Sequence, residues 1–394
     1  MLRKPLVRIA LMLIIGIVIC AAIVLPRNER VKQYMAEREV NQLLADYTDN
    51  TVLKTYDLVV DNFKKLDKAV NRLQENPSER TISEATAIWF TTRNRWKTTM
   101  AFLYGPVAFY DFDKQVAGWP LDRPMIEHTI AEIAAGRLQV DDRYLRELKH
   151  VSQRGLHAVE YLLFRDGKAR SVSEISKAEL SYLVAVTRAM VIEGLDMKAS
   201  WVGTENMNAA DSALLKAAGL KSRTAYAVEL KNPGKPESRY LTQSIPLQEI
   251  TQDTMTVMEE VCSAIDEALG SSDPRDSQTW FSYNVVDDIV HELKSAENTY
   301  MGGIEGSRGT SFSDLVAKKS DMLDQRVKLG FADLEHRIKV LGSPYNSDMN
   351  ANERDLAYRI AMQSCHALST RLLVAMPMIA LDPRTKPLGA YGIE

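Results

Sequence analysis

The sequence has little of what marks several functional classes. Its 394 residues include 49 Lys and Arg against 52 Asp and Glu, a formal net charge of −3. Nucleic-acid-binding chains normally carry a basic excess, so we expect no nucleic-acid partner. Alternating β-branched runs, which predict strands, are scarce. With 45% hydrophobic residues, the chain can bury a large core, and its length indicates two or three domains.

Two common functional motifs are also missing. A glycine-bearing stretch at residues 301–309 lacks the lysine and Ser/Thr pattern of a phosphate-binding loop. The chain has no GxSxG motif, which would present a serine nucleophile on a strand-to-helix turn. Neither nucleotide hydrolysis nor serine hydrolysis is therefore an expected activity.

Cysteine is scarce, with three in the chain. Cys20 lies in an N-terminal apolar run, while Cys262 and Cys365 lie in stretches with helical patterning. The latter two could pair in an oxidising compartment, but nothing in the sequence places them within bonding distance. Because free cysteines are commonly buried, we expect two buried free thiols.

The N-terminus carries basic residues before an apolar run from Ile9 to Leu25. The run is at the short end for a membrane helix and the long end for a signal-peptide core. Basic residues on the N-terminal flank keep that end in the cytoplasm. We expect residues 1–28 to be a membrane anchor or signal segment that is retained, cleaved or lipidated at Cys20. The rest would lie in the periplasm or cell envelope, anchored in the inner membrane or secreted across it.

The remaining residues predict an all-α fold, because apolar residues recur at helical spacing. The clearest helices are expected over residues 172–193, with a continuation past Gly194 left open, and over 247–269, 283–300, 315–341 and 353–376. The segment from Lys231 to Ser238 concentrates proline, glycine and polar residues and is the clearest break. We therefore expect a first helical bundle over residues 29–231, a linker over 232–246 and a second bundle over 247–394.

The strongest candidates for chemistry are His157 and Glu160. The run after Gly155 has no glycine or proline up to Phe164, and apolar residues flank both titratable side chains. Positions three apart share a helix face, so both side chains would point the same way inside the protein. Imidazole and carboxylate are ligands for zinc or iron, and they also pair in proton transfer. The structural alternative is a buried His–Glu hydrogen bond that satisfies both groups.

A metallopeptidase can be tested on this motif. Zincin helices have HExxH and the inverted form has HxxEH, whereas Tyr161 follows Glu160 here. A catalytic zinc typically takes three protein ligands, so other ligands would have to come from elsewhere in the fold. If the protein is a peptidase, Glu160 is the candidate ligand or base.

A second titratable cluster comprises Asp288, His291 and Glu292, which would share a helix face. Charged neighbours such as Lys294 favour a solvated face at this position. His366 lies in an apolar helix and is expected in the core. The other histidines stand beside charged residues and are expected at the surface: His128, His150 and His336.

Three patterns occur in order along the chain: Arg93-x-x-Trp96, Gly155-x-His157-x-x-Glu160 and Glu297-Asn298-Thr299-Tyr300. With them the chain resembles the imelysin family of bacterial envelope proteins, also called iron-regulated protein A-like. Related domains occur in ferrous-iron uptake systems, and the family was named for a proposed metallopeptidase activity. The first pattern often continues to an acidic residue in the family where this chain has Met100, which would leave a metal site one ligand short.

The resemblance implies two related helical bundles, an internal pseudo-repeat, with the GxHxxE helix lining a site between them. It implies His157 and Glu160 as metal ligands within a wider set of binding residues: Gly155, His157, Glu160, Arg93, Trp96, Glu297 and Tyr300. We expect an envelope protein that binds a metal, iron favoured over zinc, or a metal-linked small ligand. The alternatives are a metallopeptidase of the imelysin type, using a metal-bound water, and a non-catalytic module that binds a polymer or protein.

Overall fold

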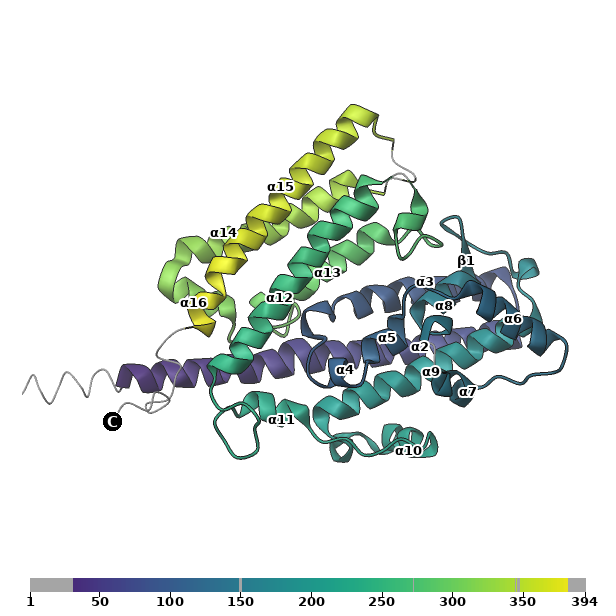
Figure 1. The fold of residues 1–394 in the computed structure, drawn as a ribbon, viewed down its shortest axis with the longest axis horizontal. Helices are drawn as coiled ribbons and strands as arrows, with labels where there is room; N and C mark the ends of the chain where they lie inside the picture. The colour runs from purple at the N-terminus through teal and green to yellow at the C-terminus, as the bar shows by residue number, and fades with distance from the viewer. Residues whose placement is uncertain (1–30, 149–150, 272, 344, 346–347, 382–394) are drawn as a thin grey trace, which may run out of the picture.

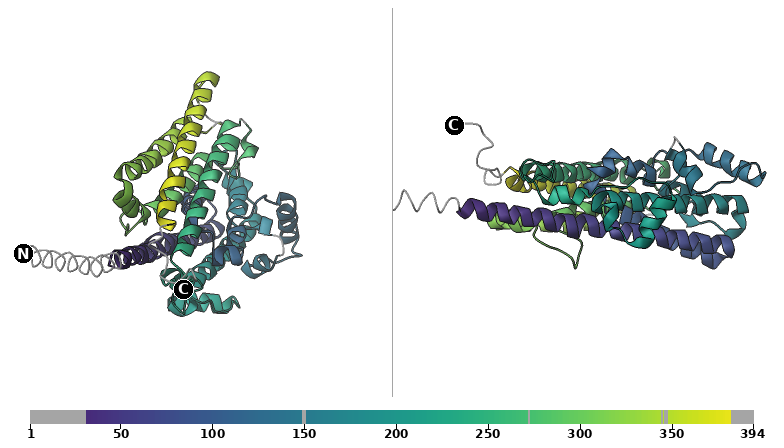
Figure 2. Two further views of the ribbon diagram at one scale, coloured as in Figure 1. Left: turned by 60° about the vertical axis from the view of Figure 1, so that its left-hand side comes forward. Right: turned by 90° about the horizontal axis from the view of Figure 1, so that it is seen from below.

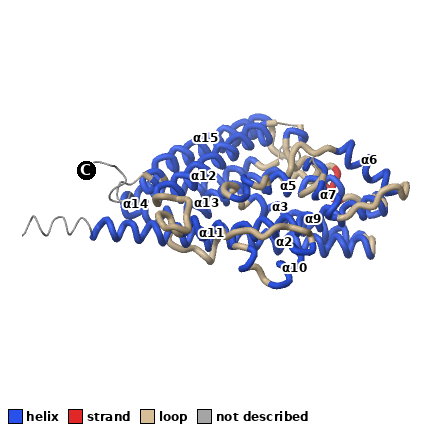
Figure 3. Tube along the Cα trace, turned by 60° about the horizontal axis from the view of Figure 1, so that its bottom comes forward, coloured by secondary structure: helices blue, strands red, loops and turns tan. Residues whose placement is uncertain are grey.

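The structure is a computed structural model that describes residues 31–148, 151–271, 273–343, 345 and 348–381. Within these residues the all-α prediction is confirmed, since helices dominate (Figures 1 and 3). The exception is a hairpin in which β1 (Phe164–Arg165) pairs with β2 (Lys168–Ala169). None of the described helices is long and apolar enough to cross a bilayer. The apolar run from Ile9 to Leu25 lies outside the described residues, and so does His150. The internal repeat stays a prediction.

The first group of helices is built on three long rods. α2 (Lys54–Glu75) packs against both α3 (Glu79–Lys97) and α9 (Lys177–Val202). Shorter elements cover α9 (Figure 1), so side chains on nearly every side of this helix are buried. The elements that cover α9 are α4 (Pro106–Phe109), α5 (Phe112–Ala117), α6 (Arg123–Ala134), α7 (Asp142–Glu147), α8 (Leu156–Leu163), η5 (Thr204–Asn206), α10 (Ala209–Ala217) and α11 (Tyr226–Lys231). The group also contains the short helices η2 (Met100–Phe102), η3 (Val151–Gln153) and η4 (Val172–Glu174).

The second group crosses the first at an angle, from green to yellow in Figure 1. Two pairs of long helices pack together, α12 with α13 and α14 with α15, and α13 also contacts α14. The elements of this group are α12 (Ser244–Ala264), the π-helical η6 (Ile265–Leu269), η7 (Pro274–Asp276), α13 (Val285–Tyr300), α14 (Phe312–Leu341), α15 (Ala351–Ala375) and α16 (Pro377–Ala380).

One helix runs along both groups. Residues 31–46 are helical and continue through the π-helical η1 (Tyr47–Leu53) into α2 without a break. The first part lies against the second group, where Lys318 pairs with Glu39 at 2.9 Å and the Thr310 amide donates to Asp46 at 2.7 Å. Figure 2 shows this helix from two further directions, extending along the molecule. This helix therefore contacts both groups, the second through residues 31–46 and the first through α2.

The two groups meet where α3 packs against α13. Buried apolar side chains of both groups form one continuous core. Polar and charged side chains enter this junction from α3, α8 and α13, and several are fully buried there. The junction is therefore the place where buried chemistry can occur.

The expectation of two free thiols was wrong. Cys262 on α12 and Cys365 on α15 form a disulfide, with their Cα atoms 5.9 Å apart. The two helices pack side by side, which brings facing positions within bonding distance. A sequence separation of 103 residues concealed the pair.

Candidate functional site between the two helix groups

The helix that carries His157 begins at a glycine that packing requires. Gly155 is the N-cap of α8 and has φ +79°, in the left-handed region. A Cβ at this position would lie 2.3 Å from the carbonyl oxygen of Val116 on α5. Gly155 therefore lets α5 press against the start of α8, and every residue of α8 is buried. Its role in the motif is to position His157 and Glu160.

His157 and Glu160 share one face of α8, as their spacing predicted. The imidazole Nδ1 lies 3.5 Å from Glu160 Oε2. Both atoms are buried, and neither has a hydrogen-bond partner among the residues that the structure describes. The other carboxylate oxygen, Oε1, accepts bonds from the Ser282 amide at 3.0 Å and the Ser282 hydroxyl at 2.8 Å. The pair thus presents one nitrogen and one oxygen to each other without a satisfied hydrogen bond.

Burial sets the charge state of both groups. Burial lowers the pKa of His157 well below its usual value, and the nearby cations Arg93 and Lys97 lower it further. The imidazole is therefore neutral at pH 7. Burial raises the pKa of Glu160 to about 8, although the Ser282 bonds and Arg93 act in the opposite direction. Near neutral pH the Glu160 carboxyl is mostly protonated.

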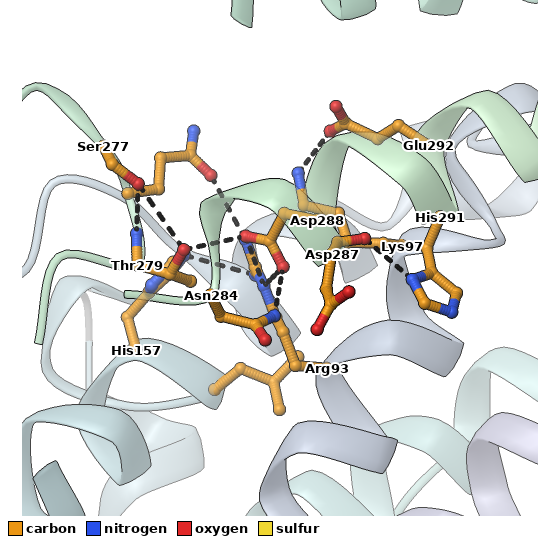
Figure 4. A network of polar contacts seen from close by, with 12 residues as sticks. Arg93, Lys97, His157, Ser277, Thr279, Asn284, Asp287, Asp288, His291 and Glu292 are labelled. Carbon is orange, nitrogen blue, oxygen red and sulfur yellow. Dashed lines mark hydrogen bonds and ion pairs between the residues drawn. The ribbon is translucent and has the colours of Figure 1, made fainter. Parts of the chain in front are cut away.

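Arg93 joins the two helix groups at this point. Its guanidinium binds Asp288 of α13 through Nε at 3.1 Å and Nη2 at 3.0 Å, and its Nη1 lies 3.4 Å from His157 Nε2 (Figure 4). Asp288 also accepts bonds from Thr279 and Asn284. Burial alone would raise the pKa of Asp288, but Arg93, Lys97 and the Asn284 hydrogen bond together outweigh it and hold that pKa below its usual value.

The expectation of a solvated face at Asp288 and Glu292 was wrong. Both carboxylates are buried, and Glu292 forms an ion pair with Lys97 of α3. His291 stays at the edge of this network, where its Nδ1 lies 2.7 Å from the Asp287 carbonyl oxygen. The α13 face turns inward because α3 supplies two cations opposite it, from a position 195 residues away in the chain.

A cavity of about 420 Å³ opens beside the Arg93–Asp288 pair. Met100 is one of the side chains that line it. Apolar side chains such as Trp96 and Ile289 form part of its wall, and Trp96 packs near Phe63. The charged lining consists of two cations and six carboxylates: Arg93, Lys97, Asp113, Glu260, Glu267, Asp276, Asp288 and Glu292. The excess of carboxylates makes the cavity favourable for cations.

The other expected site residues lie apart from His157. Glu297 pairs with Lys294 at 2.7 Å, and Tyr300 is buried and donates to Asp324 at 3.0 Å. The structure therefore gathers Arg93, His157 and Glu160 into one contact network, with Trp96 on the adjoining cavity. It does not bring Glu297 and Tyr300 into that network.

Two further members of the network were not predicted from sequence patterns. Ser282 holds Glu160, and Gln278 contacts Arg93 through its side-chain oxygen at 3.4 Å. Both lie in the irregular segment between η7 and α13, where no periodicity points inward. Among the remaining histidines, His366 was expected in the core but is exposed, because it lies on the outer face of α15. His128 and His336 are exposed as expected.

The donor set suits two ligands of a metal ion. His157 Nδ1 and Glu160 Oε2 are buried, unpartnered and of the types that bind zinc or iron. Across the described residues, no group of three or more His, Cys, Asp or Glu side chains is placed to hold an ion. Further ligands would therefore come from hydroxyl or carbonyl oxygens or from a bound molecule.

Comparisons with known proteins agree with this architecture. The family model for imelysin, peptidase M75, matches residues 52–372. The iron-regulated protein A of Synechococcus elongatus is 22% identical over 334 residues, which is 84% of this chain and 84% of that protein. A solved structure described as an iron-regulated protein A precursor from Parabacteroides distasonis has a TM-score of 0.68 at 22% identity, covering 89% of this chain and 96% of that one. An imelysin-like protein from Psychrobacter arcticum has a TM-score of 0.57 at 12% identity, with the same coverage.

Proposed function

This chain belongs to the imelysin family, and from that premise and the site geometry we propose that it binds a metal ion or a metal-linked ligand at His157 and Glu160. Iron is favoured, because the similar proteins from Synechococcus and Parabacteroides carry the name iron-regulated protein A. Zinc is the second candidate, since imidazole and carboxylate suit both metals.

The observation that carries the proposal is the pair of unpartnered atoms. His157 Nδ1 and Glu160 Oε2 lie 3.5 Å apart. Two ligands of one tetrahedral ion, each at about 2.0–2.2 Å from it, lie roughly 3.4 Å from each other. A good hydrogen bond would bring the two atoms to about 2.7–3.2 Å. The separation therefore suits shared coordination better than direct pairing.

Two protein ligands favour a metal that arrives with other ligands attached. Arg93 binds Asp288, and its Nη1 lies 3.4 Å from His157 Nε2, which orients Nδ1 toward Glu160. Because a guanidinium can only donate, the metal-free imidazole carries its proton on Nδ1, and a metal at Nδ1 would displace that proton. The acidic cavity on the far side of Arg93 would attract cations. A bound metal would supply Lewis acidity and a fixed attachment point for an oxygen-donor ligand.

The family name favours a metallopeptidase as the second candidate. Catalytic zinc typically has three protein ligands and an open position for water. In that case Glu160 would act either as a ligand or as the base, and one more ligand would be needed from the cavity wall. We propose binding ahead of hydrolysis because the two available donors would both be used as ligands. A module that binds a polymer or protein between the helix groups is the third candidate.

We also propose that the protein works in the bacterial envelope, beyond the inner membrane. The basic flank and the apolar run before Leu25 support export or anchoring. The disulfide between Cys262 and Cys365 supports an oxidising compartment.

Metal analysis of purified protein tests the function. We expect the wild type to retain stoichiometric iron or zinc after supplementation and desalting, and His157→Ala to lose it. His336→Ala, which changes an exposed histidine, should bind like the wild type. Equal metal content in the wild type and His157→Ala would overturn the assignment.

A second experiment separates the candidates. If metal is bound, an unstructured protein substrate is incubated with the loaded protein, with and without a chelator. Chelator-sensitive cleavage would favour the peptidase, and intact substrate would favour the binder. If neither form holds metal, the polymer- or protein-binding module becomes the leading candidate.

A further inference from the structure

The indole of Trp119 covers His157. The two rings have their centroids 5.0 Å apart at an interplanar angle of 57°. Trp119 is 40% exposed, whereas His157 is 1% exposed. The indole therefore has one face toward the imidazole and part of its surface in solvent.

The other neighbours of His157 are held in place. Arg93 is bound to Asp288 by several hydrogen bonds, and Glu160 is bound to Ser282 twice. By contrast, the indole nitrogen of Trp119 forms no hydrogen bond to any residue that the structure describes, and packing alone holds the ring.

The backbone around Trp119 runs between two helices and is anchored on the side of α6. The residue lies between the end of α5 at Ala117 and the start of α6 at Arg123. Asp122 donates its amide to the Ser152 carbonyl at 2.9 Å, and its carboxylate caps α6. A fixed backbone with a side chain held only by packing allows the ring to move by rotamer changes without unfolding the loop.

We propose that the Trp119 side chain controls access to His157 from solvent. With the indole in place, the imidazole is closed off. When the ring rotates outward, the face of the imidazole becomes reachable. This inference rests on the proposed function in one respect, which is that the species reaching His157 is a metal or a metal-linked ligand. The ring would set how fast a metal or metal-linked ligand reaches and leaves the His157–Glu160 pair.

Histidine labelling of the metal-free protein tests the access step directly. Diethyl pyrocarbonate modifies accessible imidazoles, and peptide mass mapping follows each histidine separately. We expect His157 to be labelled slowly in the wild type and about tenfold faster or more in Trp119→Ala, because the local opening step is removed. Trp119→Phe keeps an aromatic cover and should label close to the wild-type rate.

The exposed histidines serve as internal references: His128, His336 and His366. The labelling rate of each of these histidines should be the same in the wild type and in every variant. Circular dichroism should show the same helical signal for all of these proteins. If Trp119→Ala does not fold, Trp119→Leu provides a smaller apolar side chain. Equal His157 labelling in the wild type and a folded, uncovered variant would overturn the proposal.

Stopped-flow mixing with Fe(II) or Zn(II) ions forms the second arm. Removal of the indole should speed both association and dissociation by similar factors, so the Kd should change less than either rate. Unchanged rates in Trp119→Ala would contradict a role in entry. If labelling accelerates but no ion binds to any form, access control stands and the proposed function fails, so the two ideas are tested separately.

Discussion

Two buried pairs of side chains meet at the junction of the helix groups, and they differ in how completely they are satisfied. Arg93 and Asp288 share several hydrogen bonds, and the remaining capacity of Asp288 is taken by Thr279 and Asn284. His157 and Glu160 lie beside them, yet one atom of each is buried without a hydrogen bond to any described part of the chain. The first pair is complete within the protein, and the second is not.

The difference shows how structure and function divide at one junction. A buried ion pair is held in place when every donor and acceptor is used, and removing one partner is costly. A buried polar atom without a partner costs free energy of folding, so it calls for a specific explanation. The Arg93–Asp288 pair joins the two helix groups, while the free atoms of the His157–Glu160 pair are the basis of the ligand site that we propose.

The largest effect should come from breaking the complete pair. Asp288→Ala leaves the Arg93 guanidinium buried without its carboxylate, and we expect it to lower the free energy of unfolding by about 3–5 kcal/mol. Urea denaturation at pH 7 measures the change. Glu147→Ala breaks the exposed pair with Arg143 and should change the free energy of unfolding far less, because solvent screens that pair. A loss as small as that of the control would show that the complete pair does not hold the junction.

The buried carboxyl of the His157–Glu160 pair should make the free energy of unfolding depend on pH. The folded-state pKa of Glu160 is raised from 4.5 to about 8, so the folded protein holds a proton that the unfolded chain has lost. Wild-type stability should therefore fall as pH rises between about 4.5 and 8, by at most about 1.4 kcal/mol per pH unit from this group. Glu160→Gln removes that contribution.

Melting curves of the metal-free protein from pH 4.5 to 9 measure the effect. Glu160→Gln should lose less stability than the wild type over this range, and Glu147→Gln, an exposed control, should follow the wild type. Parallel curves for the wild type and Glu160→Gln would mean that the carboxyl is not held protonated.

A smaller change removes one of the two hydrogen bonds that Glu160 Oε1 accepts. Ser282→Ala removes the hydroxyl bond at 2.8 Å and keeps the amide bond. We expect a loss of about 1 kcal/mol in unfolding free energy and a further rise in the pKa of Glu160. Denaturation at pH 6 and 9 measures both, because the loss should be larger at pH 9. The exposed Ser173→Ala is the control, and an equal effect at the two pH values would contradict the prediction.

Helix periodicity predicted most of the fold, and the deviations have local causes. The expected helix over residues 172–193 is observed as α9 (Lys177–Val202). It starts later because Ser176 and Glu179 form a capping box. It continues past Gly194 because this glycine makes room for Phe63, whose ring carbon would lie 2.7 Å from an added Cβ. The glycine serves packing there and does not end the helix.

The candidate site was only partly predictable for a different reason. The spacing of His157 and Glu160 is local, so their shared face follows from helix geometry. The burial of Asp288 depends on Arg93, which is 195 residues away. The disulfide likewise depends on α12 meeting α15. Spacing along a single chain segment carries no information about which charged face will meet its counterpart across the fold.

The uninterrupted helix over residues 31–75 also acts as a spacer. An α-helix rises about 1.5 Å per residue, so the helix covers roughly 45 Å between residue 31 and Asn62. At that point Thr92 of α3 lies 3.5 Å from the Asn62 carbonyl, one residue before Arg93. The start of this helix at residue 31 is therefore held apart from the His157 junction by a continuous helical rod. A partner that docks at the start of this helix and delivers a ligand to the junction would have to span the distance from residue 31 to Asn62.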